Sequence, residues 1–187
     1  MNFFSRGSHG IIGLLLSLFL CPPVEALAAA NPELERRALG VLSNLYRRSG
    51  HAVATNRDAV AVLIFPDVRK LGLGVTVQTS TGVLFRKFQP IAYFNMTGLS
   101  CGLEAGVQKY DCVYFFMTEE ALDHLYLSGG FEVDCAPALV FVDGMFTPSV
   151  SLSTRREGIR RFLFNYKGLM ANFGIQATKL SEFIPSR

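Results

Sequence analysis

The chain shows two spacings of apolar side chains, one typical of an amphipathic helix and one typical of strands. After residue 30, apolar residues recur every three or four positions, which predicts a helix. Asn31 caps it, Pro32 takes its first position, and Ser49-Gly50 ends it. The apolar stripe of this helix comprises Leu34, Ala38, Val41 and Leu45. Its basic residues are Arg36, Arg37, Arg47 and Arg48.

Beyond this helix, short apolar runs and alternating segments predict strands. Residues 71–78 and 82–88 predict a hairpin across Thr79-Ser80-Thr81. A short helix near 119–128 begins after the cap residue Thr118. Further strands are predicted at 59–65, 91–96, 112–117, 131–142, 162–166 and 169–179. We therefore expect an α+β fold: a single β-rich domain with a curved antiparallel or barrel-like sheet, an N-terminal amphipathic helix and a second short helix.

Glycine recurs four positions apart at Gly98, Gly102 and Gly106. In an apolar helix this spacing would mark a face for helix dimerisation in a membrane. Glu104 and Lys109 within the same segment make a membrane helix untenable. We predict instead that these glycines lie in a bent strand.

The first thirty residues have the layout of a secretory signal. Arg6 precedes the apolar run 11–20, which is too short for a comfortable membrane span, and Ala26-Leu27-Ala28 closes the segment with small residues. We expect residues 1–28 to form a signal peptide, with cleavage after Ala28 or Ala30, and the protein to be exported to the periplasm.

Cys21 in this leader offers the alternative of a lipoprotein. An acylation site requires a small residue just before the cysteine, and Leu20 is large, so soluble release is favoured. The remaining residues, 31–187, suit one domain with its own core.

Three cysteines lie beyond the leader: Cys101, Cys112 and Cys135. An oxidising compartment permits one disulfide and leaves one thiol over. If Cys112 and Cys135 lie on adjacent strands, they could form that bond and leave Cys101 reduced. The alternative is that the cysteines are small buried residues in strands.

Charge is distributed unevenly along the chain. Residues 31–90 contain nine Lys or Arg against four Asp or Glu, residues 91–154 one against eight, and residues 155–187 seven against two. Two basic segments around an acidic one suggest a polarised surface that faces an anionic partner. The alternative is that the acidic segment pairs with the basic ones.

No arrangement of residues predicts catalysis or a cofactor. His51 and His124 belong to no recognisable nucleophile–base order, and neighbouring Glu119 and Glu120 diverge on a helix. No Cys/His cluster has the spacing of a structural metal site. We therefore expect neither enzymatic activity nor a bound cofactor or metal, and no nucleic-acid partner.

Four blocks of sequence together resemble the SYLF domain family. They are 62–74 (VLIFPDVRKLGLG), 102–108 (GLEAGVQ), 116–122 (FMTEEAL) and 167–171 (KGLMA), the last followed by Thr178-Lys179. The resemblance implies a lipid-binding module without known catalytic chemistry. It also implies membrane contact through an N-terminal amphipathic helix and basic residues. Eukaryotic members bind phosphoinositides and, in yeast, actin, but actin is no expected partner of an exported bacterial protein.

The function predicted from these observations is binding of anionic phospholipid or an anionic membrane surface in the bacterial envelope. A second basic segment, before the apolar residues 162–164, adds guanidinium groups suited to phosphate. Surface salt bridges are the alternative role for these arginines. The alternative function belongs to a different class: docking of an unknown envelope protein through the polarised surface. The residues predicted to bind lipid are Leu34, Arg36, Arg37, Val41, Leu45, Arg47, Arg48, Arg155, Arg156, Arg160, Arg161 and Lys167.

Overall fold

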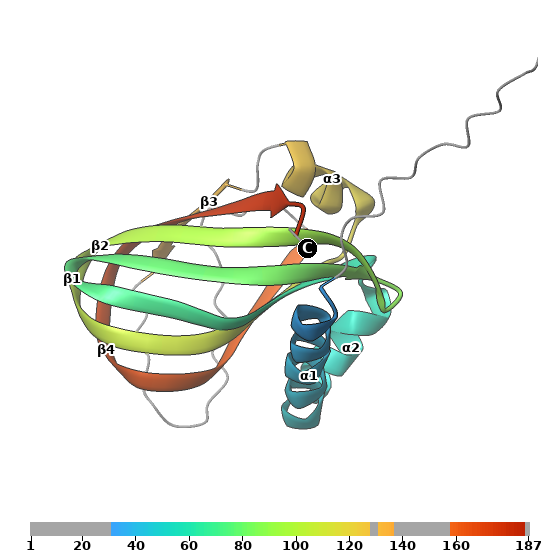
Figure 1. The fold of residues 1–187 in the computed structure, drawn as a ribbon, viewed down its shortest axis with the longest axis horizontal. Coiled ribbons are helices and arrows are strands. Elements are labelled where there is room, and N and C mark those ends of the chain that lie inside the picture. Colours follow the sequence, from blue (N-terminus) through green and yellow to red (C-terminus); the bar gives the residue numbers. More distant parts are fainter. Residues whose placement is uncertain (1–30, 128–130, 137–157, 186–187) are drawn as a thin grey trace, which may run out of the picture.

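The computed structural model describes residues 31–127, 131–136 and 158–185, which form helices around one antiparallel sheet (Figure 1). The predicted α+β class is confirmed. The helices are α1 (Pro32–Arg48), α2 (Gly50–Asp58) and α3 (Glu119–Leu127). The strands are β1 (Ala61–Arg86), β2 (Gln89–Phe116), β3 (Phe131–Ala136) and β4 (Ile159–Phe183).

The helix boundaries follow from local capping. The side chain of Asn31 accepts a hydrogen bond from the Leu34 amide at 3.1 Å, which confirms the predicted start of α1. Thr118 accepts in the same way from the Ala121 amide at 3.2 Å and starts α3 as predicted. Helix α2 was not predicted from the sequence; the Ser49 side chain caps it directly after α1.

The hairpin turn between β1 and β2 is not where the sequence predicted it. Thr79-Ser80-Thr81 continues β1 without a break, since Thr79 still pairs with Thr97. The chain turns instead at Lys87 and Phe88, whose φ angles are 49° and 64°. Two left-handed residues indicate a type I′ turn, which usually contains Asn and Gly, so the usual sequence signal was missing.

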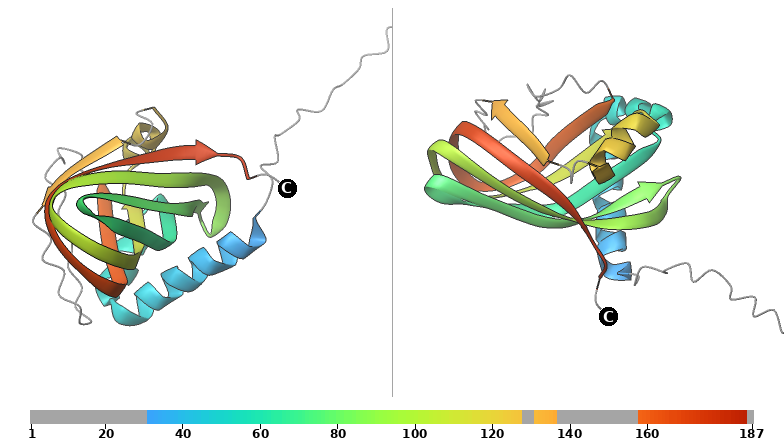
Figure 2. Two further views of the ribbon diagram at one scale, coloured as in Figure 1. Left: turned by 60° about the vertical axis from the view of Figure 1, so that its left-hand side comes forward. Right: turned by 90° about the horizontal axis from the view of Figure 1, so that it is seen from above.

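The sheet has the order β1-β2-β4-β3, and its long strands bend through their middle so that it curves around itself without closing (Figure 2). The two halves of β1 come together: the Ser80 hydroxyl donates to the Pro66 carbonyl at 2.8 Å. A Cβ on Gly82 would lie 2.5 Å from the Ile64 carbonyl oxygen, so only glycine fits this contact.

Glycines allow the bend where β2 meets β4. Gly106 has a φ of 134° and Gly168 a φ of 96°, both in the region that favours glycine. A Cβ on Gly106 would lie 2.2 Å from the Leu169 carbonyl oxygen. The prediction that the spaced glycines lie in a bent strand is confirmed, because residues 98–106 belong to β2.

Helices cover both faces of the end of the sheet that lies away from this bend. On one face, α1 buries its apolar stripe against a group that includes Phe115 and Phe162, whose rings meet edge to face 5.4 Å apart. On the other, Leu122 and Leu125 of α3 join a second buried group.

The predicted Cys112–Cys135 disulfide does not fit the topology. β4 lies between β2, which carries Cys112, and β3, which carries Cys135. Cys112 pairs with Leu163 and Cys135 with Ile175, at separate places along β4. Two strand spacings of about 4.8 Å already exceed the roughly 7 Å between Cα atoms that a disulfide tolerates. Cys112 is buried in a strand, in agreement with the alternative prediction, whereas Cys101 is exposed and contradicts it.

Candidate functional site

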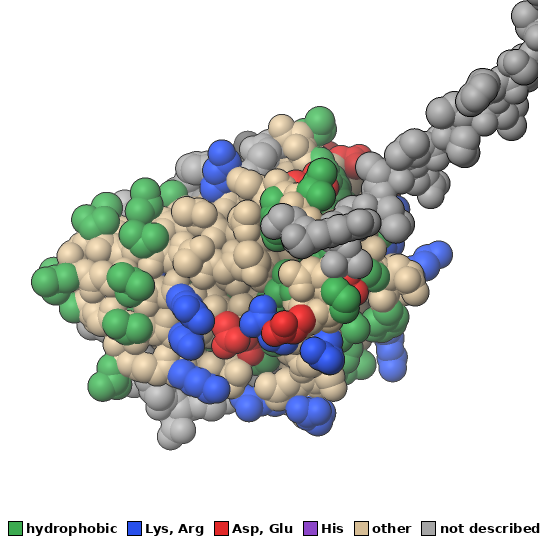
Figure 3. Space-filling view, in the orientation of Figure 1, with side chains coloured by type: hydrophobic (Ala, Val, Ile, Leu, Met, Phe, Trp, Pro, Cys, Tyr) green, Lys and Arg blue, Asp and Glu red, His purple; other side chains and the backbone are tan. Residues whose placement is uncertain are grey.

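The bend in the sheet has apolar side chains on its outside. Leu73, Leu103 and Leu169 are 83%, 80% and 81% exposed, and their neighbours on the same face are apolar as well. Figure 3 shows hydrophobic side chains gathered at the bent end of the molecule. We name this surface the apolar bend. It consists of Leu71, Leu73, Val75, Val77, Leu99, Leu103, Val107 and Leu169.

Strand register makes the apolar bend one continuous surface. Leu71 of β1 pairs with Val107 of β2, which pairs in turn with Leu169 of β4. Further along, Val77 pairs with Leu99. A contiguous exposed apolar face is uncommon on a monomeric protein and marks an interaction surface.

The inside of the same bend is polar and holds a buried ion pair. Lys70 Nζ lies 3.3 Å from Glu104 Oε1, and the two side chains are 2% and 1% exposed. Thr76 donates to the other carboxylate oxygen at 2.6 Å, and Ser100 donates to it as well. Lys70 also donates to the Gln176 side chain at 3.2 Å. The buried charges are thus paired and hydrogen-bonded, as burial requires.

Burial and hydrogen bonding act in opposite directions on this pair. Burial would raise the pKa of Glu104, but hydrogen bonds from Ser100 and Thr76 and the charge of Lys70 lower it overall. Burial lowers the pKa of Lys70, and the attraction of Glu104 opposes that shift without cancelling it. The carboxylate is therefore held in its charged form inside the bend.

A second buried network continues the polar interior. Tyr110 donates its hydroxyl to the Gln78 side chain at 2.7 Å, and Gln78 donates to Thr178 at 3.0 Å. All three residues are buried. The bend thus inverts the usual arrangement of a sheet: its polar side chains point inward and its apolar side chains point outward.

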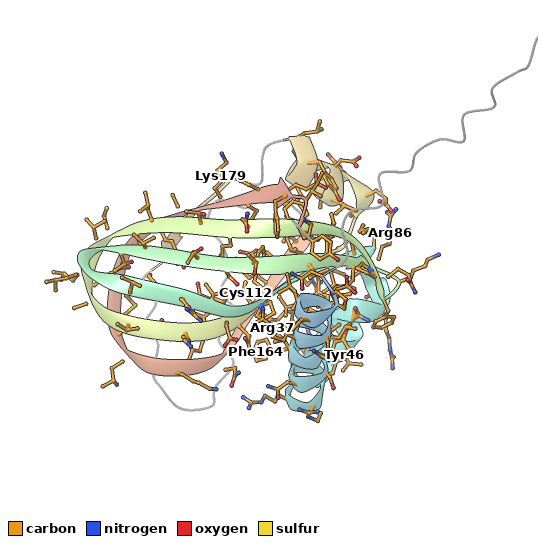
Figure 4. All side chains as sticks on the ribbon, viewed as in Figure 1. Arg37, Tyr46, Arg86, Cys112, Phe164 and Lys179 are labelled. Carbon is orange, nitrogen blue, oxygen red and sulfur yellow. The ribbon has the colours of Figure 1, made fainter. Side chains whose placement is uncertain are left out.

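Cations flank the apolar bend. Arg69, Lys109 and Lys167 are exposed and lie side by side on β1, β2 and β4, two positions beyond Leu71, Val107 and Leu169. We name these three residues the cation row. No carboxylate pairs with them within the residues that the structure describes. On the opposite side of the apolar bend, Lys179 points away from the sheet (Figure 4).

A known family matches the segment that carries half of the residues of the apolar bend. Residues 97–182, just under half of the chain, match the Ysc84 family model, described as Las17-binding protein actin regulator. This segment is similar to the SYLF domain family. The resemblance drawn from the sequence is thereby confirmed over residues 97–182, and its block at 62–74 lies outside the match. SYLF domains bind lipids and actin and are not a known enzyme family. No curated protein matches the chain.

Helix α1, which precedes the matched segment, is not presented as predicted from the sequence. Leu34 and Leu45 are 3% and 0% exposed and pack on the sheet, and Val41 is half-buried against the same core. The apolar stripe of α1 is therefore used for folding and is not available to lipid. The basic residues Arg36, Arg37, Arg47 and Arg48 are exposed on the outside of α1.

The basic segment near the C-terminus is only partly described. Arg155 and Arg156 lie outside the described residues. Arg160 is exposed and Arg161 half-buried on β4, where a strand splits them between its two faces. Of the apolar residues after them, Phe162 and Phe164 are buried. Of the predicted lipid-binding residues, Lys167 alone belongs to the cation row.

The alternative reading of the charge pattern has support as well. Both ion pairs of the described ranges, Lys70–Glu104 and Arg86–Glu119, join the first basic segment to the acidic segment. Internal ion pairs thus partly neutralise the uneven distribution of charge along the chain. The cation row is a local feature of three adjacent strands. The net charges of long segments of the chain do not show it.

The described residues hold no feature that points to metal binding. Across residues 31–127 and the described part of β3 and β4, no group of three His, Cys, Asp or Glu side chains is placed to hold an ion. In the same ranges no helix has the length and apolar character needed to cross a membrane.

Proposed function

We propose that this chain is a non-enzymatic protein that binds anionic membrane surfaces of the bacterial envelope through the apolar bend and the cation row. The observation that carries the proposal is the inverted bend, where leucines are more than three-quarters exposed while a charged pair is buried behind them. An apolar surface next to unpaired cations complements the interface of an anionic bilayer, which offers acyl chains beneath phosphates.

Sheet geometry supports shallow insertion of side chains. Among the described strands β1 lies at the edge of the sheet, so along the bend none of them pairs with its outer backbone groups. Such groups are costly to bury in hydrocarbon without hydrogen bonds, whereas the leucine side chains carry no such cost. The proposed binding mode therefore places the side chains of the apolar bend at the boundary of headgroups and acyl chains and leaves the backbone in the hydrated layer.

The leader-like segment 1–28 supports an exported location for this activity. We do not extend Las17 binding or actin regulation to this chain, because an exported bacterial protein would not meet those partners. Of the two binding activities of the SYLF family, lipid and actin binding, the apolar bend favours lipid binding.

Removing the cation row tests the electrostatic half of the proposal. The variant Arg69→Gln/Lys109→Gln/Lys167→Gln should bind vesicles of phosphatidylglycerol and phosphatidylcholine about 100-fold more weakly than the parent at low salt. Each cation near an anionic surface contributes about 1 kcal/mol, and salt screens that contribution. Co-sedimentation with vesicles at two salt concentrations measures the change.

The matched control removes three cations from α1 instead, as Arg36→Gln/Arg37→Gln/Arg47→Gln. This variant has the same net charge and should bind nearly as tightly as the parent. If it loses as much affinity as the cation-row variant, net charge alone drives binding. Parental affinity in the cation-row variant would refute the proposed surface.

A further inference from the structure

A groove of about 660 Å³ lies at the other end of the molecule from the apolar bend. It runs between the end of α2, the start of β1, the β1–β2 turn and the start of α3. Figures 1 and 2 place α2 and this turn together at the end remote from the bend. The groove is therefore separate from the surface proposed for membrane binding.

The groove combines an apolar floor with a basic rim. Leu42, Val62 and Phe85 contribute buried apolar side chains to it. Exposed Arg57 of α2 and Lys87 of the turn stand at its edge. Within the described residues neither of these two cations pairs with a carboxylate.

A third cation, Arg86 (labelled in Figure 4), lines the same groove and is bound to Glu119 in an exposed ion pair. The lining thus has three cations against one carboxylate, an excess of positive charge around an apolar floor. This combination complements an amphiphile that carries a phosphate on an apolar body.

The turn that supplies Lys87 and Phe88 has an unfavourable backbone. Both residues are left-handed, at φ 49° and 64°, where non-glycine side chains cost about 1–2 kcal/mol each. Asn-Gly would form the same turn without that cost. The strained residues present a cation and a 60% exposed aromatic ring to the groove. Strain of this kind concentrates at binding sites, which gives a second and independent reason to assign one here.

We propose that this groove binds a single anionic phospholipid-type amphiphile, with its phosphate at Arg57 and Lys87 and its apolar part over Phe88 and the floor. The geometry requires both parts of the ligand. A phosphate without an apolar chain would leave the floor uncovered, and a zwitterionic headgroup would bring a cation toward a basic rim.

Calorimetry of the full chain with short-chain lipids below their micelle concentration tests this site without any membrane. Dihexanoyl phosphatidylglycerol should bind, and Arg57→Gln/Lys87→Gln should weaken that binding about tenfold or more. Dihexanoyl phosphatidylcholine and inorganic phosphate should bind at least tenfold more weakly than dihexanoyl phosphatidylglycerol. Phe88→Ser should weaken dihexanoyl phosphatidylglycerol binding and leave the weak affinity for inorganic phosphate unchanged.

The matched control, Arg36→Gln/Arg47→Gln, removes two cations of α1 that do not line the groove and should bind dihexanoyl phosphatidylglycerol like the parent. The inference is overturned if the parent does not bind dihexanoyl phosphatidylglycerol, if Arg57→Gln/Lys87→Gln binds it equally well, or if inorganic phosphate binds as tightly. The result at the groove is independent of the vesicle experiments on the apolar bend, because the groove variants should still sediment with anionic vesicles.

Discussion

Replacing Leu73 and Leu103 by Asp should abolish binding to anionic vesicles while the protein stays folded. Both side chains are at least 80% exposed, so their loss removes almost no core contact. A leucine buried in an apolar environment contributes about 1.5–3 kcal/mol, so losing two weakens binding by about two orders of magnitude or more. The new carboxylates add repulsion from the phosphates. Vesicle co-sedimentation measures the loss, and thermal unfolding followed by circular dichroism checks the fold.

Two other exposed leucines provide the control for this variant. Leu39 lies on the outer side of α1, and Leu127 is the last residue of α3. Leu39→Asp/Leu127→Asp makes the same change in charge and apolar content away from the apolar bend and should bind like the parent. Undiminished vesicle binding by Leu73→Asp/Leu103→Asp would show that the apolar bend does not contact lipid.

Replacing Lys70 by Met should destabilise the protein by about 3–5 kcal/mol. The substitution leaves the Glu104 carboxylate buried without its charge partner, the costly way to break a buried ion pair. Thr76 and Ser100 keep their hydrogen bonds to the carboxylate. Because these bonds still stabilise the buried charge, the loss of stability should lie near the lower end of this range. The free energy of unfolding from urea denaturation measures the change.

The double variant Lys70→Met/Glu104→Gln should recover part of this loss, because no uncompensated charge remains in the bend. A Lys70→Met variant as stable as the parent would mean that the pair is hydrated rather than buried. The parent should also lose stability in acid. The pKa of Glu104 is lowered by folding from its ordinary value of 4.5, so its contribution is complete above that pH and is lost as the pH falls through the folded value.

The outline of the fold could be predicted because it rests on local signals. Asn31 followed by Pro32 favours a helix start through local hydrogen bonding, and Thr118 before two glutamates does the same. Alternation located parts of the strands but not their length: residues 91–96 and 112–117 were predicted as separate strands and are the two ends of β2. The turn at Lys87 and Phe88 could not be predicted, because its left-handed residues are of types that rarely adopt that conformation.

The candidate site escaped sequence analysis for a different physical reason. Alternation of Leu71, Leu73, Val75 and Val77 with polar residues shows that two faces exist, but not which of them is buried. The ordinary expectation that apolar residues point inward fails here, since partners far along the chain, such as Ser100 and Glu104, satisfy the buried polar face. The apolar stripe of α1 was the clearer pattern, and it forms part of the core.

A single tryptophan tests the central claim most directly, because the chain contains none of its own. The variant Leu103→Trp places the reporter on the apolar bend, and Leu39→Trp places it on the exposed side of α1. On addition of phosphatidylglycerol vesicles, emission from Leu103→Trp should shift to shorter wavelength and be quenched by lipids brominated in their acyl chains, while emission from Leu39→Trp stays unchanged. A shift and quenching at residue 39 with none at residue 103 would contradict the account and return the membrane contact to α1.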